Sequence, residues 1–207
     1  TLDHVIAWHW CKHETIHDYQ RLLERIPAPL IVVIDGGQGA ATAIKNCWPE
    51  TKIQRCLVHA QRVVRRYTTS RPRTDAGRTI YQLALKLTRI TTLDDAATWG
   101  AQLHEFSTIY RAWMNEKTRL KDPKTGKWKD AWTHANVRSA YNSLNHLWRG
   151  NLLLVYLAPP DGVLDASRIK ANKTAGRRNQ RPVETAGPHP PGKIREHQRR
   201  MLDWWLY

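Results

Sequence analysis

A run of branched apolar residues that stops at an acid constrains the fold more than any other feature of this sequence. Residues 31–34 read IVVI, and they lie between Pro29 and a segment in which Asp35 is followed by three glycines within four positions. An uninterrupted apolar run of this length, bounded by proline and glycine, is typical of a central strand that is buried on both faces. The sequence therefore predicts a sheet covered by helices, with a carboxylate where the buried strand ends.

The neighbouring segments alternate between strand and helix patterns. Residues 4–11 alternate as a strand does, and residues 15–26 carry apolar side chains at helical spacing behind Thr15, a good N-cap residue. Residues 38–48 are expected to be helical, and residues 52–66 to form a short strand that passes into a basic helix. This order predicts an α/β fold.

From about Thr69 the pattern becomes helical throughout. Residues 75–90, 92–118 and 133–157 carry apolar residues three and four positions apart, and a turn over residues 121–130 separates the last two blocks. We therefore expect an all-helical unit that is attached to the α/β core or inserted into it.

The charge balance points to a polyanionic partner. Lys and Arg number 33 against 18 Asp and Glu, so the formal net charge is +15. Basic side chains that neutralise phosphates release counterions, which favours nucleic acid over a merely solvated basic surface. Three cysteines that cannot all pair indicate a reducing cytosol, and no apolar run is long enough for a membrane helix. We expect a soluble, cytoplasmic protein without a membrane partner.

Asp35 and the glycines after it allow three interpretations: a phosphate-binding loop, an ordinary turn into a helix, or a metal-binding carboxylate. A Walker loop needs a lysine followed by Ser or Thr, and the dinucleotide fingerprint needs a third glycine where Thr42 stands. The glycines more simply permit a sharp turn. Taken alone, an aspartate here more often caps a helix than binds a metal.

A longer window resembles the Mutator-type transposases of bacterial insertion sequences. In that family an Asp-Gly pair at a strand end precedes a helix, then Trp-Pro, then Gln-Arg-Cys-x-x-His and a basic helix. The matching positions in this chain are Asp35-Gly36, Trp48-Pro49, Gln54-Arg55-Cys56, His59 and Arg62. The resemblance extends to the terminal residues 196–207 and so covers most of the chain.

This resemblance implies a partial ribonuclease-H-like core with a large all-helical insertion. It divides the chain into a core over 1–68, a helical insertion over 69–158, an irregular segment over 159–192 and a C-terminal helix over 193–207. In such a core three carboxylates hold two Mg²⁺ or Mn²⁺ ions about 4 Å apart. The resemblance makes Asp35 the second acid, a catalytic metal ligand, and places Gly36, Cys56 and His59 around it.

The other two acids of the family pattern have no match. The first acid belongs to a strand before the one that opens this chain, and Asp3 lies in the wrong strand, so we expect an N-terminal truncation. The third should be a glutamate after the insertion, but residues 173–192 are proline-rich and without helical period. A reading frame shifted by one base restores family-like sequence over 177–192, so we hypothesise a frameshift there. Glu184 receives no role, and residues 171–192 are expected to be irregular.

Several further residues have competing interpretations. Cys56 and His59 resemble half of a zinc site, but Cys11 and Cys47 lack matching spacing, which favours a buried thiol and an orienting histidine. The tryptophans at these positions can stack on bases but more often belong to a core: Trp8, Trp10, Trp99, Trp113 and Trp148. The histidines expected at the surface are His9, His13 and His17.

Two functions follow from these interpretations. One is a transposase that cleaves transposon ends with metal ions and joins them to target DNA, working in the bacterial nucleoid as a homo-oligomer. The alternative is a catalytically inactive remnant that still binds DNA. Because two acids are missing, we expect this chain to bind DNA without cutting it. The arginines expected to contact DNA are Arg62, Arg65, Arg66, Arg71 and Arg73, followed later by Arg177, Arg178 and Arg181.

Overall fold

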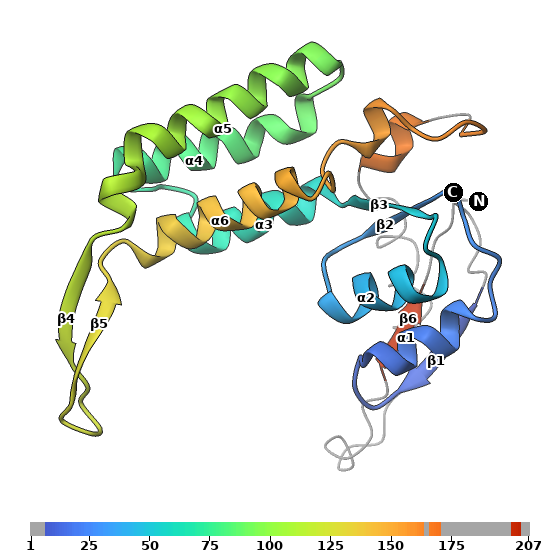
Figure 1. Cartoon of the computed structure of the whole chain (residues 1–207), viewed down its shortest axis with the longest axis horizontal. Coiled ribbons are helices and arrows are strands. Elements are labelled where there is room, and N and C mark those ends of the chain that lie inside the picture. The colour runs from blue at the N-terminus through green and yellow to red at the C-terminus, as the bar shows by residue number, and fades with distance from the viewer. Residues whose placement is uncertain (1–6, 164–165, 171–199, 204–207) are drawn as a thin grey trace, which may run out of the picture. The chain divides into compact units, whose positions relative to one another are not determined.

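A computed structural model describes residues 7–163, 166–170 and 200–203 (Figure 1). Of the irregular segment expected over 159–192, the part from residue 171 onward lies outside these residues, whereas Ala166–Lys170 forms a short 3₁₀ helix. The expected frameshift, Asp3, Glu184, Arg177, Arg178 and Arg181 also lie outside the described residues. The chain divides into two compact units, Thr1–Cys56 together with Leu154–Tyr207, and Leu57–Leu153. The second unit is thus inserted in sequence within the first.

The first unit mixes strands and helices, as the sequence predicted. Before the insertion point the elements are β1 (Trp8–Cys11), α1 (Ile16–Leu23), β2 (Ile31–Ile34), α2 (Gln38–Cys47) and β3 (Lys52–Arg55). After it come the short 3₁₀ helices η2 (Val155–Leu157) and η3 (Ala166–Lys170), and the strand β6 (Arg200–Asp203). The returning chain contacts β3, since the buried Gln54 side chain accepts a 2.9 Å hydrogen bond from the Val155 amide.

The strands of this unit pair two by two among the described residues. β2 runs parallel to β3, with Ile31 opposite Lys52 and Ile34 opposite Arg55. β1 runs antiparallel to β6. Ile31 and Val32 are completely buried, which confirms the predicted burial of this strand. The apolar run also predicted a central strand, but within the described part of the chain β2 pairs with β3 alone. An apolar run indicates that a strand is buried; it does not indicate how many strands hydrogen-bond to it.

Helix α1 begins where the sequence predicted. The Thr15 hydroxyl accepts a 3.2 Å hydrogen bond from the Asp18 amide and so caps the first turn. The face predicted from the helical spacing is buried, with Tyr19, Leu22 and Leu23 in the core.

The second unit consists of helices with one hairpin. Its elements are α3 (Leu57–Thr68), α4 (Asp75–Lys86), η1 (Leu87–Arg89), α5 (Leu93–Met114), β4 (Lys117–Lys121), β5 (Trp128–Trp132) and α6 (Ala135–Arg149). Helix α3 packs against α4 and α6, and α5 packs against α4 and α6. In Figure 1 the hairpin extends beyond the ends of α5 and α6. Helix α3, which we had assigned to the core, therefore packs within the helical unit.

The prediction of an all-helical unit is wrong at this hairpin. Residues 117–118, expected to end a helix, belong to β4, and the turn predicted over 121–130 connects two strands. The Asp122 side chain accepts a 2.9 Å hydrogen bond from the Lys124 amide, and Gly126 has a φ of +69°. These two features close a tight turn that brings the flanking segments together as strands. Because the residues on either side of the turn have helical periodicity, the sequence did not indicate this strand pairing.

The C-terminal helix expected over 193–207 is not present in the part of that range that the structure describes. Arg200–Asp203 forms β6 and pairs with β1, from Trp8 opposite Asp203 to Cys11 opposite Arg200. A strand stabilised by a partner nearly 200 residues away in sequence leaves no local pattern that distinguishes it from a helix.

The tryptophans divide between core and surface. Trp99 is buried and donates a 2.8 Å hydrogen bond from its indole Nε1 to the Leu83 carbonyl, as expected for a core residue. Trp113 and Trp148 are half-buried. The core prediction is wrong for Trp8 and Trp10, which are 50% and 46% exposed, because they lie on the uncovered face of β1.

The histidines near the N-terminus also divide. His13 and His17 are exposed, as predicted. His9 instead is half-buried, and its Nε2 lies 3.3 Å from a carboxylate oxygen of Asp18. Because His9 alternates with the outward tryptophans on β1, it points toward α1, which the helical spacing alone did not show. Among the described helices, none combines the length and apolar character needed to cross a membrane.

Candidate functional site

The parallel pairing of β2 and β3 brings two sequence-predicted residues to one edge. Ile34 lies opposite Arg55 at the ends of the two strands, so Asp35 and Cys56 follow at the same edge. The Cys56 amide donates a 2.8 Å hydrogen bond to the Ile34 carbonyl. The structure therefore places Asp35, Gly36 and Cys56 at the same edge.

Gly36 occupies a position that only glycine fits without rearrangement. Its φ is +115°, a conformation that residues with a side chain rarely adopt. A Cβ atom on Gly36 would overlap the guanidinium of Arg55. The guanidinium of Arg55 thus lies directly against the backbone that follows Asp35.

Arg55 is a charged group within this edge that the sequence analysis gave no role. Burial lowers the pKa of Arg55, and the negative charge of Asp35 opposes that effect. Its Nε atom is buried without a hydrogen-bond partner among the described residues. The sequence signal for Arg55 is its place as the last residue of β3, directly opposite the last residue before Asp35.

The Asp35 carboxylate does not cap helix α2. The N-cap is Gly37, and no side chain hydrogen-bonds to the first turn. Within residues 7–163, 166–170 and 200–203, no hydrogen bond or ion pair involves the Asp35 side chain, which is exposed. The capping interpretation is therefore wrong, and the carboxylate is accessible at the strand end.

Tyr19 and Glu14 form a second polar pair near this edge. The Tyr19 hydroxyl donates a 3.1 Å hydrogen bond to Oε2 of Glu14. Burial raises the pKa of Tyr19 far above its ordinary value, and the charges of Glu14 and Asp35 add to that shift. Tyr19 therefore stays a neutral donor and lies within electrostatic reach of both carboxylates. Glu14 lies in a loop with no motif around it, so its sequence context gave no signal for this role.

His59 and the predicted DNA-binding arginines belong to the second unit. His59 is half-buried on α3, whereas Arg62, Arg65 and Arg66 are exposed on the same helix, three and four residues apart, so they share one face. Arg71 and Arg73 are exposed in the segment between α3 and α4. None of the ion pairs found in the described part of the chain involves these five arginines, so no acid neutralises them there.

A family model described as "Transposase, Mutator family" matches residues 22–153, which is more than half of the chain. The matched range includes Asp35, Cys56, His59 and the whole helical unit. The chain belongs to the Mutator family of transposases. This confirms the family indicated by the motif around Asp35. No curated protein and no solved structure matches the chain.

The described residues of this Mutator-family chain do not provide the ligands of a two-ion site. Among them, no group of three or more His, Cys, Asp or Glu side chains is arranged to hold a metal ion. Asp35 offers one accessible carboxylate, and the thiol of Cys56, which is completely buried, joins no such group. The donor set present at the β2–β3 edge therefore does not fit the pair of divalent ions that the family resemblance implies.

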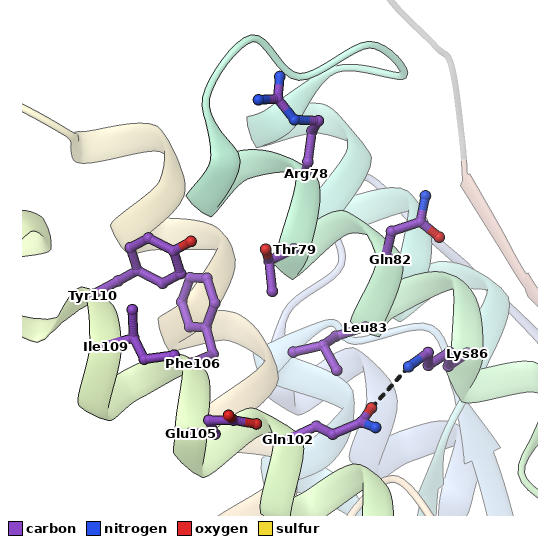
Figure 2. Close-up of a pocket in the computed structure, with 10 residues that line it drawn as sticks. All are labelled: Arg78, Thr79, Gln82, Leu83, Lys86, Gln102, Glu105, Phe106, Ile109 and Tyr110. Carbon is purple, nitrogen blue, oxygen red and sulfur yellow. Dashed lines mark hydrogen bonds between the residues drawn. The ribbon is translucent and has the colours of Figure 1, made fainter.

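A pocket of the helical unit lies away from the predicted site residues. It has a volume of about 440 Å³ and lies between α4 and α5 (Figure 2). Apolar side chains such as Leu83, Phe106 and Ile109 line it, and Lys86 hydrogen-bonds to Gln102 at 2.9 Å along one side. It contains none of the residues that the Mutator-type motif singles out.

Proposed function

We propose that this Mutator-family chain acts in DNA transposition as a DNA-binding segment and does not cleave DNA by itself. The observation that carries the proposal is the exposed arginine face of α3. Arg62, Arg65 and Arg66 lie on one side of the helix without an acid partner in the described structure, while Leu57, Ala60 and Val64 bury the other side. An unneutralised row of guanidinium groups favours phosphate, which arginine binds through paired hydrogen bonds.

We further propose that the α/β unit is part of a ribonuclease-H-like core with the helical unit as its insertion. In support, β2 and β3 are parallel, Asp35 follows the first of them, and the helical unit leaves after Cys56 and returns at Leu154. In this assignment Asp35 is the metal ligand, with Gly36, Cys56 and His59 as its surroundings. Mg²⁺ or Mn²⁺ supplies charge stabilisation in such sites, but one carboxylate holds two ions poorly. Cleavage by this chain alone is therefore not expected.

Salt dependence of DNA binding tests the arginine face. If Arg62, Arg65, Arg66, Arg71 and Arg73 each contact a phosphate, the slope of log affinity against log salt for duplex DNA is about −4.5. Replacing Arg62, Arg65 and Arg66 by alanine should reduce it to about −1.8. Fluorescence anisotropy with a labelled duplex measures both slopes.

A matched control separates this face from net charge alone. Arg21, Lys45 and Lys52 are exposed in the first unit, so their triple alanine variant removes as many charges as the α3 variant without touching α3. Its slope should remain close to that of the unchanged chain. An equal loss in both variants, or a slope near zero in the unchanged chain, would contradict a DNA site on α3.

A plasmid-nicking assay with Mg²⁺ or Mn²⁺ tests the lack of cleavage. We expect no nicking by the unchanged chain or by Asp35→Asn, because among the described residues no group of three or more metal-ligating side chains is arranged to hold an ion. Metal-dependent nicking that disappears in Asp35→Asn would show a complete catalytic site and refute this part of the proposal.

We also propose that transposon ends and target DNA are the partners, that the chain forms a homo-oligomer, and that it is associated with the bacterial nucleoid. The family membership supports DNA as the partner in general terms. Sedimentation of the chain with and without duplex DNA measures the oligomeric state, and a monomer under both conditions would contradict self-association.

A further inference from the structure

The β4–β5 hairpin carries basic and aromatic side chains on one face. In its antiparallel register Lys117 lies opposite Trp132, Arg119 opposite Asp130 and Lys121 opposite Trp128. Opposed residues, and residues two apart along a strand, point to the same side of a sheet. We call this side the basic-aromatic face; its residues are Lys117, Arg119, Lys121, Trp128, Asp130 and Trp132.

This face is exposed although it contains two indole rings. Trp128 is 59% exposed and Trp132 is 39% exposed, and every residue of β4 is exposed as well. A two-stranded hairpin without a core is only marginally stable, and large apolar groups in water mark surfaces that bind a partner. The exposure of both rings therefore indicates a binding surface.

The base of the hairpin is held firmly against the helices. His134 stacks on Trp113 with ring centroids 3.5 Å apart, and its Nε2 lies 3.0 Å from Oε2 of Glu116. The Thr133 amide donates a 3.0 Å hydrogen bond to the Glu116 carbonyl. The strands thus extend from an anchored base (Figure 1), so the face is presented without the entropy cost of ordering a loose loop.

Cations lie over the indole rings of this face. Nζ of Lys117 is 4.8 Å from the ring centroid of Trp132, and the Arg138 guanidinium is 4.0 Å from the same ring. The Arg119 guanidinium is 5.9 Å from Trp128. These contacts position positive charge beside flat apolar surfaces. Trp128, with its single and more distant cation contact, has the more accessible ring.

The net positive charge of the hairpin favours an anionic ligand. Lys124, Lys127 and Lys129 add to the three basic residues of the face, and the acids of the hairpin are Asp122 and Asp130. Asp122 is already engaged by the turn and by Lys129 at 3.4 Å. Lysine-rich strand edges also repel a second copy of the same hairpin. A polyanion that also carries flat hydrophobic groups can pair with the basic side chains and stack on the indole rings.

We propose that the basic-aromatic face binds unpaired DNA, with Trp128 stacking on a base and Lys117, Arg119 and Lys121 contacting phosphates. The choice of DNA rests on the proposed function in transposition. Bases in a duplex are already stacked on one another, whereas an unpaired base offers a free ring face to an indole. Trp128 therefore contributes to the binding of single strands and not to that of intact duplex.

Substitutions on the two sides of the hairpin test this assignment. Trp128→Ala should weaken binding of the full chain to oligothymidine of about 20 nucleotides by about 5- to 100-fold, and leave duplex binding unchanged. Trp128→Phe should retain most of the affinity because it keeps a ring. Leu120→Ala is the matched control, since Leu120 is 47% exposed on the opposite side of the hairpin, and should have no effect. Fluorescence anisotropy measures the affinities of the unchanged chain and of the three variants for both forms of DNA.

The outcomes separate this inference from the proposed function. Equal effects of Trp128→Ala and Leu120→Ala, with duplex binding that depends on the α3 arginines, would overturn the inference alone. Failure of the unchanged chain to bind either form of DNA would overturn both. Tighter binding to oligouridine than to oligothymidine would contradict DNA as the occupant.

Photocrosslinking provides a measurement that needs no variant. A single strand containing 5-iodouracil should crosslink to the unchanged chain, with the modified peptide, identified by mass spectrometry, within residues 117–132. Crosslinks found only outside this range would overturn the assignment even if a hairpin variant failed to fold.

Discussion

Substitution of Gly36 by alanine tests the local geometry of the candidate site. The change introduces two costs. The backbone must keep a φ of +115°, which costs a residue with a Cβ about 1–3 kcal/mol, and the new methyl group overlaps the Arg55 guanidinium. Both costs act in the folded state, so the free energy of unfolding should fall.

The backbone cost should dominate the loss. The guanidinium is the end of a flexible side chain, and burial lowers the pKa of Arg55, so moving this charge into water removes a desolvation penalty. We therefore expect Gly36→Ala to destabilise the chain by about 1–3 kcal/mol despite the severe overlap. In an Arg55→Ala background the same change should cost nearly as much, with a coupling energy below about 1 kcal/mol.

Urea denaturation measures these differences, and two other glycines provide controls. Gly126 has a φ of +69° with no atom within 4 Å of an added Cβ, so Gly126→Ala isolates a backbone cost of about 1 kcal/mol. Gly39 lies in α2, where a Cβ meets the Tyr19 ring at an ordinary 3.6 Å, so Gly39→Ala should stabilise by up to about 1 kcal/mol. An unchanged stability for Gly36→Ala, or a coupling above about 2 kcal/mol with Arg55, would refute this reasoning.

Two further substitutions test the helical unit. Hydrogen bonds from Thr91 lower the pKa of Asp95 below its ordinary value of 3.8, so its stabilisation is present above that pH and is lost as the pH falls through the folded-state pKa. Asp95→Asn should therefore flatten the acid limb of the stability curve, whereas Asp94→Asn should not; parallel acid limbs for the two would be inconsistent with this. Trp99→Phe should cost about 1–3 kcal/mol in urea denaturation because the buried Leu83 carbonyl loses the 2.8 Å hydrogen bond from the indole, and a neutral change would mean that water replaces it.

Elements with strong local signals were predictable. The cap at Thr15 and the buried face of α1 follow from residue type and helical spacing, and the end of β2 follows from an apolar run that stops at Asp35. Each of these signals lies within a few residues along the chain, so the local sequence is sufficient to predict these elements.

Elements that are stabilised by strand pairing were not predictable from local signals. β6 pairs with β1 across almost the whole chain, and the β4–β5 hairpin forms where the flanks look helical, because a closing turn and cross-strand contacts outweigh local propensity. Residue type alone predicts core positions for Trp8 and Trp10, yet only one face of β1 is covered.

For the candidate site as well, some features could be predicted from the sequence and others could not. The motif from Asp35 to His59 determined the family and the position of the carboxylate, since the parallel strands end beside each other. Only the tertiary structure showed that Arg55 lies against Gly36 and that Tyr19 is held by Glu14, because these side chains come from separate elements and meet only when the strands and helices pack. Likewise, the basic residues of the hairpin were visible as charge in the sequence, but the antiparallel register alone placed them on one face with two exposed indole rings.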